Sequence, residues 1–222
     1  PGTDLQKIHQ GLTTLRGISS GKILMWSTLR EDQTLDDCFA EFLDLHEQKL
    51  VDLFFWHWVE TEQPYQRFAD YCARYEADLE TVMAHYLARL REGYILPVIH
   101  INELIIFALT GLRRNSSGCG VEVADNFDLL DGKIHSCADL PTEMDIGHID
   151  AKGYPHIRPV DLMGLVEYKK PLGCYQCGVH DYCGGRCPVQ AHISSSERLR
   201  QYCQLMRLHV AVVLSSLDEI RE

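Results

Sequence analysis

Four cysteines within fourteen residues are the part of this sequence best suited to chemistry: Cys174, Cys177, Cys183 and Cys187. Thiols used for packing alone would bury little area, and four so close together would be prone to oxidation. The first two have the CxxC spacing that directs two thiolates at one point. Three glycines in the same stretch allow the backbone to wrap closely around a bound metal: Gly178, Gly184 and Gly185. The spacing therefore predicts a metal centre.

The chain contains nine cysteines, and seven of them follow residue 118. The two earlier ones, Cys38 and Cys72, have core spacing on apolar helix faces, so we predict that both are buried thiols. Two bound zinc ions are one explanation for the other seven cysteines, but zinc sites favour two separate CxxC pairs. Here the CxxC is followed by gaps of five and three residues, which suit a larger inorganic centre. The Cys187-Pro188 pair resembles the Cys-Pro ending of bacterial ferredoxin cluster loops.

The first half of the sequence predicts alternating helices and strands. Helical periodicity and short apolar runs give this order: helix 4–15, strand 22–28, a helix capped by Thr34, strand 51–59, helix 66–91 and helix 97–110. The strand at 51–59 is almost uninterruptedly apolar, as expected of a parallel strand covered on both faces. Two strands cannot close a barrel. We therefore predict an α/β fold in which residues 1–112 are the C-terminal portion of a larger β/α barrel with a linking helix.

From residue 113 to residue 222 the sequence predicts a cysteine-rich domain. Residues 119–137 have the pattern of a β-hairpin, with a strand GVEV, a turn at Asp125-Asn126, and then FDLLDGKI, which turns again at Asp131-Gly132. Residues 138–172 are mixed and rich in turns. A last helix begins at about Ser195 and carries apolar residues along one side.

The intervals between the seven later cysteines resemble the signature of the SPASM domain. This domain is the C-terminal extension of many radical S-adenosylmethionine (SAM) enzymes that modify peptides and proteins. The matching positions are Cys119, x12, Gly132, x4, Cys137, a gap, Cys174, x2, Cys177, x5, Cys183, x3, Cys187, a gap and Cys203. The match covers about residues 117–210. Residues 1–110 are compatible with the last part of the partial (β/α)6 barrel that precedes such domains.

The resemblance implies two auxiliary [4Fe–4S] clusters in this chain. The ligands would be Cys119, Cys137 and Cys187 for the first cluster, and Cys174, Cys177, Cys183 and Cys203 for the second. Because Cys187 would cross from the later loop to the hairpin's cluster, the region should lose its fold when iron is removed. The fourth position of the first cluster is then either open for substrate or filled by a group such as His135 or Asp139.

The sequence departs from this family in two respects. Sulfatase-maturating members have a catalytic aspartate directly after the cysteine that matches Cys137. Here Ala138 takes that place and Asp139 follows, and on a strand this shift turns the side chain to the other face. The family's SAM-binding CxxxCxxC motif is absent from these 222 residues, which open with Pro1-Gly2. We therefore expect a C-terminal half that cannot cleave SAM alone, with SAM and a third [4Fe–4S] cluster in an N-terminal half.

For the intact protein, the resemblance implies a radical SAM maturase of ribosomal peptides or proteins. A deoxyadenosyl radical would abstract a hydrogen from the precursor peptide or protein, and the auxiliary clusters would engage the substrate or relay its electron. A flavodoxin or ferredoxin is the expected electron donor. The alternatives are a non-catalytic two-cluster electron-transfer module and a zinc-stapled interaction module.

Five residues at the ends of the two predicted strands lie where barrel folds keep their active face. We predict that Ser27, Thr28 and Arg30 contact SAM or substrate. Trp56 and His57 share this position, but in so apolar a strand they are more typical of a core.

Composition limits the partners and the compartment. A net charge of −11 argues against nucleic acid or an anionic membrane surface. No apolar stretch approaches the ~20 residues that span a bilayer, and no export leader is present. An odd number of unevenly placed cysteines argues against a secreted disulfide framework. We therefore expect a cytoplasmic protein.

Overall fold

The computed structural model describes residues 4–123, 127–185 and 187–221. The chain divides into two compact units. The first unit comprises Pro1–Val59, Tyr65–Thr110 and Gln201–Glu222, and the second comprises Glu60–Pro64 and Gly111–Arg200.

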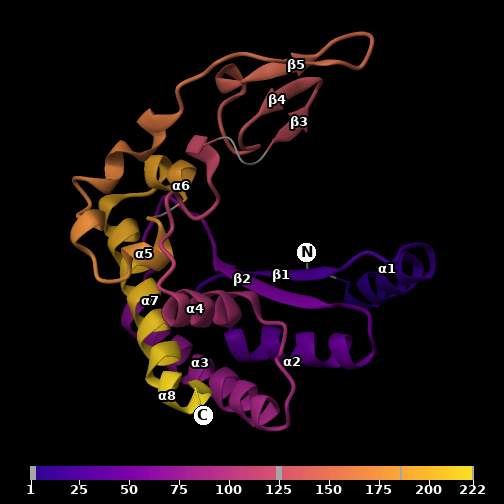
Figure 1. Ribbon diagram of the computed structural model, residues 1–222, viewed down its shortest axis with the longest axis vertical. Coiled ribbons are helices and arrows are strands. Elements are labelled where there is room, and N and C mark those ends of the chain that lie inside the picture. Colours follow the sequence, from indigo (N-terminus) through magenta and orange to yellow (C-terminus); the bar gives the residue numbers. More distant parts are fainter. Residues whose placement is uncertain (1–3, 124–126, 186, 222) are drawn as a thin grey trace. The chain divides into compact units, whose positions relative to one another are not determined.

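Two parallel strands form the centre of the first unit (Figure 1). Strand β1 spans Leu24–Leu29 and strand β2 spans Leu53–Trp58. The backbone N–H of Phe54 also donates to the carbonyl of Pro97 at 2.9 Å, so the chain at Pro97 and Val98 lies alongside β2 as a further parallel partner. Among the described residues, the strands of this unit do not close into a barrel.

The helices of the first unit lie close to where the sequence predicts them. They are α1 Leu5–Ile18, α2 Leu35–Glu47, α3 Phe68–Arg91, α4 Ile99–Thr110, the later part of α7 Ser196–Ser215, and α8 Leu217–Arg221. The predicted cap of α2 is confirmed, because the Thr34 hydroxyl accepts a hydrogen bond from the Asp37 N–H at 3.1 Å. Helix α4 begins two residues later than predicted, since Pro97 and Val98 are held extended beside β2.

Helices cover one face of the β1–β2 pair, and Figure 1 shows α2, α3 and α4 on the same side of it. On that face Phe54, Trp56 and Trp58 are buried. The ring of Phe54 stacks on Phe42 of α2 with centroids 5.0 Å apart. On the opposite face Trp26 is 59% exposed. The residues of β2 on that face, including Phe55 and His57, are only half-buried. The prediction that the second strand is covered on both faces is therefore confirmed for one face alone.

A polar chain runs through the helix-covered side of the first unit. The indole N–H of Trp56 donates to the hydroxyl of Tyr75 on α3 at 3.2 Å, and that hydroxyl lies 3.2 Å from Nδ1 of His209 on α7. Burial lowers the pKa of His209 well below its usual value, and the nearby ring of His100 lowers it further. His209 is therefore neutral at physiological pH and serves the fold as a hydrogen-bond partner of Tyr75.

The stability of the first unit should fall as the pH drops below 6.5. Unfolded His209 binds a proton there while folded His209 does not, so each pH unit down to the folded pKa costs up to about 1.4 kcal/mol. The measurement is urea unfolding followed by tryptophan fluorescence, because all three tryptophans lie in this unit.

His209→Phe should flatten this acid dependence, whereas the same change at the exposed His85 should leave it intact. Identical pH profiles for the protein and His209→Phe would show that another group is responsible.

The second unit contains an antiparallel sheet of four short strands in the order β3-β4-β5-β6. Their bounds are β3 Asp128–Leu130, β4 Lys133–His135, β5 Gly147–Ile149 and β6 Pro155–Ile157. The predicted turn between the first two is confirmed: Asp131 and Gly132 both have positive φ, 50° and 77°, as a tight hairpin turn requires. Strands β5 and β6 fall in the stretch 138–172, which is mixed and rich in turns in the sequence and for which no strand is predicted.

One predicted strand is wrong, because the GVEV segment contains a 3-10 turn at Val121–Val123. The predicted turn at Asp125-Asn126 lies outside the described residues. Short helical segments make up much of the remaining unit, in the order η2 Thr142–Met144, η3 Met163–Lys169, η4 Cys174–Gln176, α5 His180–Cys183 and α6 Pro188–Ile193, followed by the start of α7.

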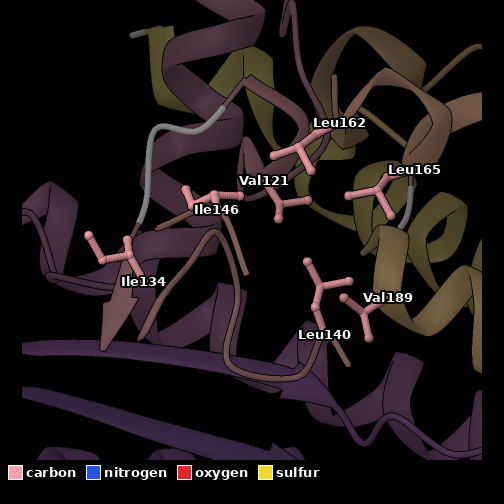
Figure 2. Packing of buried hydrophobic residues seen from close by; sticks show 7 residues of the cluster. All are labelled: Val121, Ile134, Leu140, Ile146, Leu162, Leu165 and Val189. Carbon is pink, nitrogen blue, oxygen red and sulfur yellow. The ribbon is translucent and has the colours of Figure 1, made fainter. Parts of the chain in front are cut away.

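A small apolar cluster holds the second unit together (Figure 2). Its seven buried members come from separate segments: Val121, Ile134, Leu140, Ile146, Leu162, Leu165 and Val189. Cys137 and Cys187 pack against it. In the described part of the chain, no helix combines the length and apolar character needed to cross a membrane.

Candidate metal centre

Three of the predicted ligands lie within electrostatic range of one another in the second unit. Cys119 precedes the Val121–Val123 turn, Cys137 follows β4, and Cys187 stands at the start of α6. Cys119 interacts electrostatically with both Cys137 and Cys187. The fold thus brings Cys119 within electrostatic range of two thiols, Cys137 and Cys187, that lie 18 and 68 residues further along the sequence.

Burial keeps two of these thiols protonated. Burial is the main cause that raises the pKa of Cys187 to about 12, and the nearby Glu60 and Cys119 contribute to the increase. A hydrogen bond from the Gln190 N–H lowers the pKa, but by less than burial raises it. Burial also raises the pKa of Cys137. Metal binding would therefore have to displace these protons, as it does when a metal binds neutral thiols.

Three more predicted ligands lie at two short helices: Cys174 begins η4, Cys177 directly follows it, and Cys183 ends α5. The N–H of Cys177 donates to the carbonyl of Cys174 at 3.0 Å, and the Cys183 thiol donates to the carbonyl of Gly185 at 3.1 Å. Gly184 has a φ of 66°, and a Cβ there would come within 2.5 Å of the Ser116 carbonyl oxygen. As predicted from this glycine, another part of the molecule lies very close to its backbone, but that part is the segment before Cys119.

An arginine that sequence reasoning passed over ties this segment to α5. The Arg114 N–H donates to the carbonyl of Asp181 at 2.8 Å, and its guanidinium donates to the carbonyls of Tyr182 and Gly118 at 2.8 and 3.0 Å. Arg114 thus positions the loop that enters Cys119 against the helix that ends at Cys183. An arginine in a polar linker carries no local signal of such a role.

A buried ion pair lies close by. Nζ of Lys169 is 3.7 Å from a carboxylate oxygen of Glu122, and their side chains are 7% and 2% exposed. Ser117 donates to the same carboxylate through its N–H and its hydroxyl. Burial by itself would raise the pKa of Glu122, but the Ser117 hydrogen bonds and Lys169 together hold it below its usual value. The Glu122 carboxylate therefore stays ionised, and its pairing with Lys169 joins the Cys119 segment to η3.

Buried side chains with polar atoms that have no hydrogen-bond partner lie within three residues of predicted ligands in the sequence. They are His135 and Ser136 just before Cys137, Gln190 three residues after Cys187, and His180 between Cys177 and Cys183. Each such group costs about 1–3 kcal/mol of stability. The sulfides of an iron–sulfur cluster accept hydrogen bonds, so a cluster bound by these cysteines would offer partners to hydroxyl, amide and ring N–H groups. The residues present fit such a group.

All nine cysteines are described, and none of them is in a disulfide. Cys38 and Cys72 are half-buried, and burial raises the pKa of both thiols. Cys203 lies in the part of α7 that belongs to the first unit. Within residues 4–123, 127–185 and 187–221, no three His, Cys, Asp or Glu side chains converge closely enough to hold a single metal ion.

The three residues predicted to contact SAM or substrate point in different directions. Thr28 stands opposite His57 in the strand register, and its hydroxyl lies 2.7 Å from the His57 Nε2 on the face that helices leave uncovered. Ser27 lies on the other face, where its hydroxyl hydrogen-bonds to the Cys38 thiol. Arg30 is exposed and pairs with Asp32 at 3.6 Å. Thr28 and His57 therefore form the polar pair at the carboxyl end of these strands.

No protein-family model matches the sequence, and no curated protein matches it. Solved structures do match the fold. Native anSMEcpe with bound AdoMet aligns with a TM-score of 0.61 at 14% identity, over 96% of this chain and 60% of its own. A His-tagged form with AdoMet gives 0.60 at 13% identity, over 96% and 61%. The complex with AdoMet and the Cp18Cys peptide gives 0.56 at 14% identity, over 96% and 62%.

These solved structures are of a SPASM-domain radical SAM enzyme, an anaerobic sulfatase maturase. The likeness shows that the chain has a mixed α/β fold that matches part of a radical SAM enzyme. The chain spans 60–62% of the length of the structures that it matches.

Proposed function

We propose that this chain is the auxiliary-cluster half of a radical SAM enzyme that modifies a peptide or protein. The observation that supports the proposal is the electrostatic interaction of Cys119 with Cys137 and Cys187, together with the buried, unpartnered polar atoms within three residues of Cys137 and Cys187 in sequence. The fold likeness to a radical SAM maturase supports the same class. Two [4Fe–4S] clusters bound to the seven later cysteines would supply one-electron transfer and a site to engage the substrate.

The residues of the chain have distinct tasks in this proposal. Arg114 and the Glu122–Lys169 pair hold the segment around Cys119 in place, and Cys119 interacts electrostatically with Cys137 and Cys187. Thr28 and His57 present hydrogen-bonding groups at the carboxyl end of parallel strands, where β/α folds bind their ligands. We assign this pair to SAM or substrate. Ser27 faces the helices instead, where its hydroxyl hydrogen-bonds to the Cys38 thiol, so its side chain is not part of this pair.

The partners follow from the same proposal. One of the matched structures holds a peptide, and an extended peptide is the substrate that we propose for this chain. A flavodoxin or ferredoxin would supply the electrons. The CxxxCxxC motif for SAM cleavage would come from outside these 222 residues.

The test is anaerobic reconstitution of the protein with iron and sulfide. We expect a brown protein that holds about eight irons, as two [4Fe–4S] clusters require. Replacing Cys187 by serine should lower the iron content, whereas Cys72→Ser, on α3 of the first unit, should leave it unchanged. Metal analysis and Mössbauer spectroscopy give the counts.

A colourless protein that takes up zinc and no iron would overturn the proposal in favour of a zinc-stapled interaction module. If the protein binds two clusters but does not function together with a SAM-cleaving half, the result favours the electron-transfer module.

A further inference from the structure

The side chain of His135 is buried without any hydrogen-bond partner. It is 0% exposed, and neither ring nitrogen has a partner within hydrogen-bonding distance. Leaving such a group unsatisfied costs about 1–3 kcal/mol, so a buried side chain with two unpartnered nitrogens requires a structural or functional explanation. His135 is the last residue of β4 and stands two residues before Cys137.

Asp128 shows that this ring and Cys137 share one region of the sheet. Asp128 is directly opposite His135 in the β3–β4 register, and directly opposite residues present their side chains to the same face. The Asp128 carboxylate accepts a hydrogen bond from the Ala138 N–H at 2.8 Å and interacts electrostatically with the Cys137 thiol. The face that carries the His135 ring is therefore the face beside Cys137.

We propose that His135 is the fourth protein ligand of the iron–sulfur cluster held by Cys119, Cys137 and Cys187. This inference rests on the proposed function, because it presupposes that the three thiols bind a cluster. A neutral imidazole nitrogen is a good ligand for iron, and histidine takes the place of cysteine in some iron–sulfur proteins. The assignment also explains why a ring with two polar atoms is buried here.

Two carboxylates near the same thiols are weaker candidates. Glu60 hydrogen-bonds with the Cys187 thiol. Asp139 donates its backbone N–H to the sulfur of Cys137. Both side chains can interact with water, since Glu60 is half-buried and Asp139 is exposed. The imidazole of His135 is instead fully buried, and neither of its nitrogens has a protein partner.

The test uses the reconstituted protein with either natural or ¹⁵N-labelled histidine, reduced and examined by pulsed EPR. We expect a nitrogen hyperfine coupling to the reduced cluster that changes with the label and is lost in His135→Ala. His135→Cys should keep the cluster and its iron content but lose the coupling, and its midpoint potential should move downward, because a thiolate is more electron-donating than an imidazole. His148→Ala is the matched control, since His148 is exposed on the neighbouring strand β5.

Several results would overturn the inference. One is two intact clusters without histidine coupling in the unmodified protein, which would leave the proposed function standing. Another is a coupling that persists in His135→Ala or disappears in His148→Ala. If His135→Ala does not fold, His135→Cys alone decides, because a retained coupling there excludes His135 as the ligand. Failure of the unmodified protein to bind any cluster is a different outcome, since it removes the proposed function itself.

Discussion

Stripping iron from the cluster-loaded protein is expected to unfold the second unit while the first unit stays folded. The second unit has little else to hold it: its strands are three residues long, and its main apolar cluster has seven buried members. Sheets this short are marginal by themselves. The first unit instead has a 24-residue helix and a core of stacked aromatic rings.

The expected effect is large because metal binding supplies folding free energy directly. Structural metals contribute on the order of 10 kcal/mol in small domains, which is as much as the whole stability of a typical domain. We expect amide hydrogen exchange across Gly111–Arg200 to speed up at least about 100-fold after anaerobic chelation, since every 1.4 kcal/mol is a factor of ten. Exchange in β1 and β2 should change little.

Mass spectrometry of peptides from both units measures this in one experiment, and the first unit serves as the internal control. Equal protection of the second unit with and without iron would show that its apolar cluster suffices for folding. That result would contradict the proposed role of the cysteines as structural ligands.

The second large effect is expected at the buried ion pair. Glu122→Gln should destabilise the second unit by roughly 3–5 kcal/mol, because it leaves the buried Lys169 ammonium without a counter-charge. Adding Lys169→Met to Glu122→Gln should recover most of that loss, since the pair is then replaced by neutral groups. Native-state hydrogen exchange in urea measures the free energy of unfolding for this unit separately from the first.

An exposed ion pair provides the control. Arg67 and Asp70 lie 2.8 Å apart with side chains 78% and 64% exposed, so Asp70→Asn should cost less than about 1 kcal/mol. A loss below 1 kcal/mol for Glu122→Gln, or a double variant no more stable than the single one, would contradict the assignment of a buried charge pair.

The same pair predicts that the stability of the second unit falls at acid pH. The pKa of Glu122 is lower in the folded protein than its usual value of 4.5, so the unfolded state binds more protons as the pH falls. The stabilisation by ionised Glu122 is therefore complete above pH 4.5 and is lost as the pH falls through the lowered pKa. Glu122→Gln should remove this dependence, because an amide does not titrate.

The sequence by itself determined the features that depend on neighbours along the chain. Helical periodicity placed α2 and α3, and the Asp131-Gly132 pair located a hairpin turn, because turn chemistry and side-chain spacing are local properties. Cysteine intervals predicted the metal centre in the same way, and that assignment stays a prediction. Strands of three residues carry too little periodicity to be recognised, which is why β5 and β6 were missed.

Only the tertiary structure decided which distant groups meet. Glu60 reaches Cys187, Lys169 pairs with Glu122, and Tyr75 contacts His209, although each pair is separated by more than forty residues. Such contacts depend on the path of the whole backbone. The local sequence around an acidic residue or a lysine does not show whether its side chain is exposed to water or buried in an ion pair. For the same reason, the burial of His135 beside the cysteines became visible only in the fold.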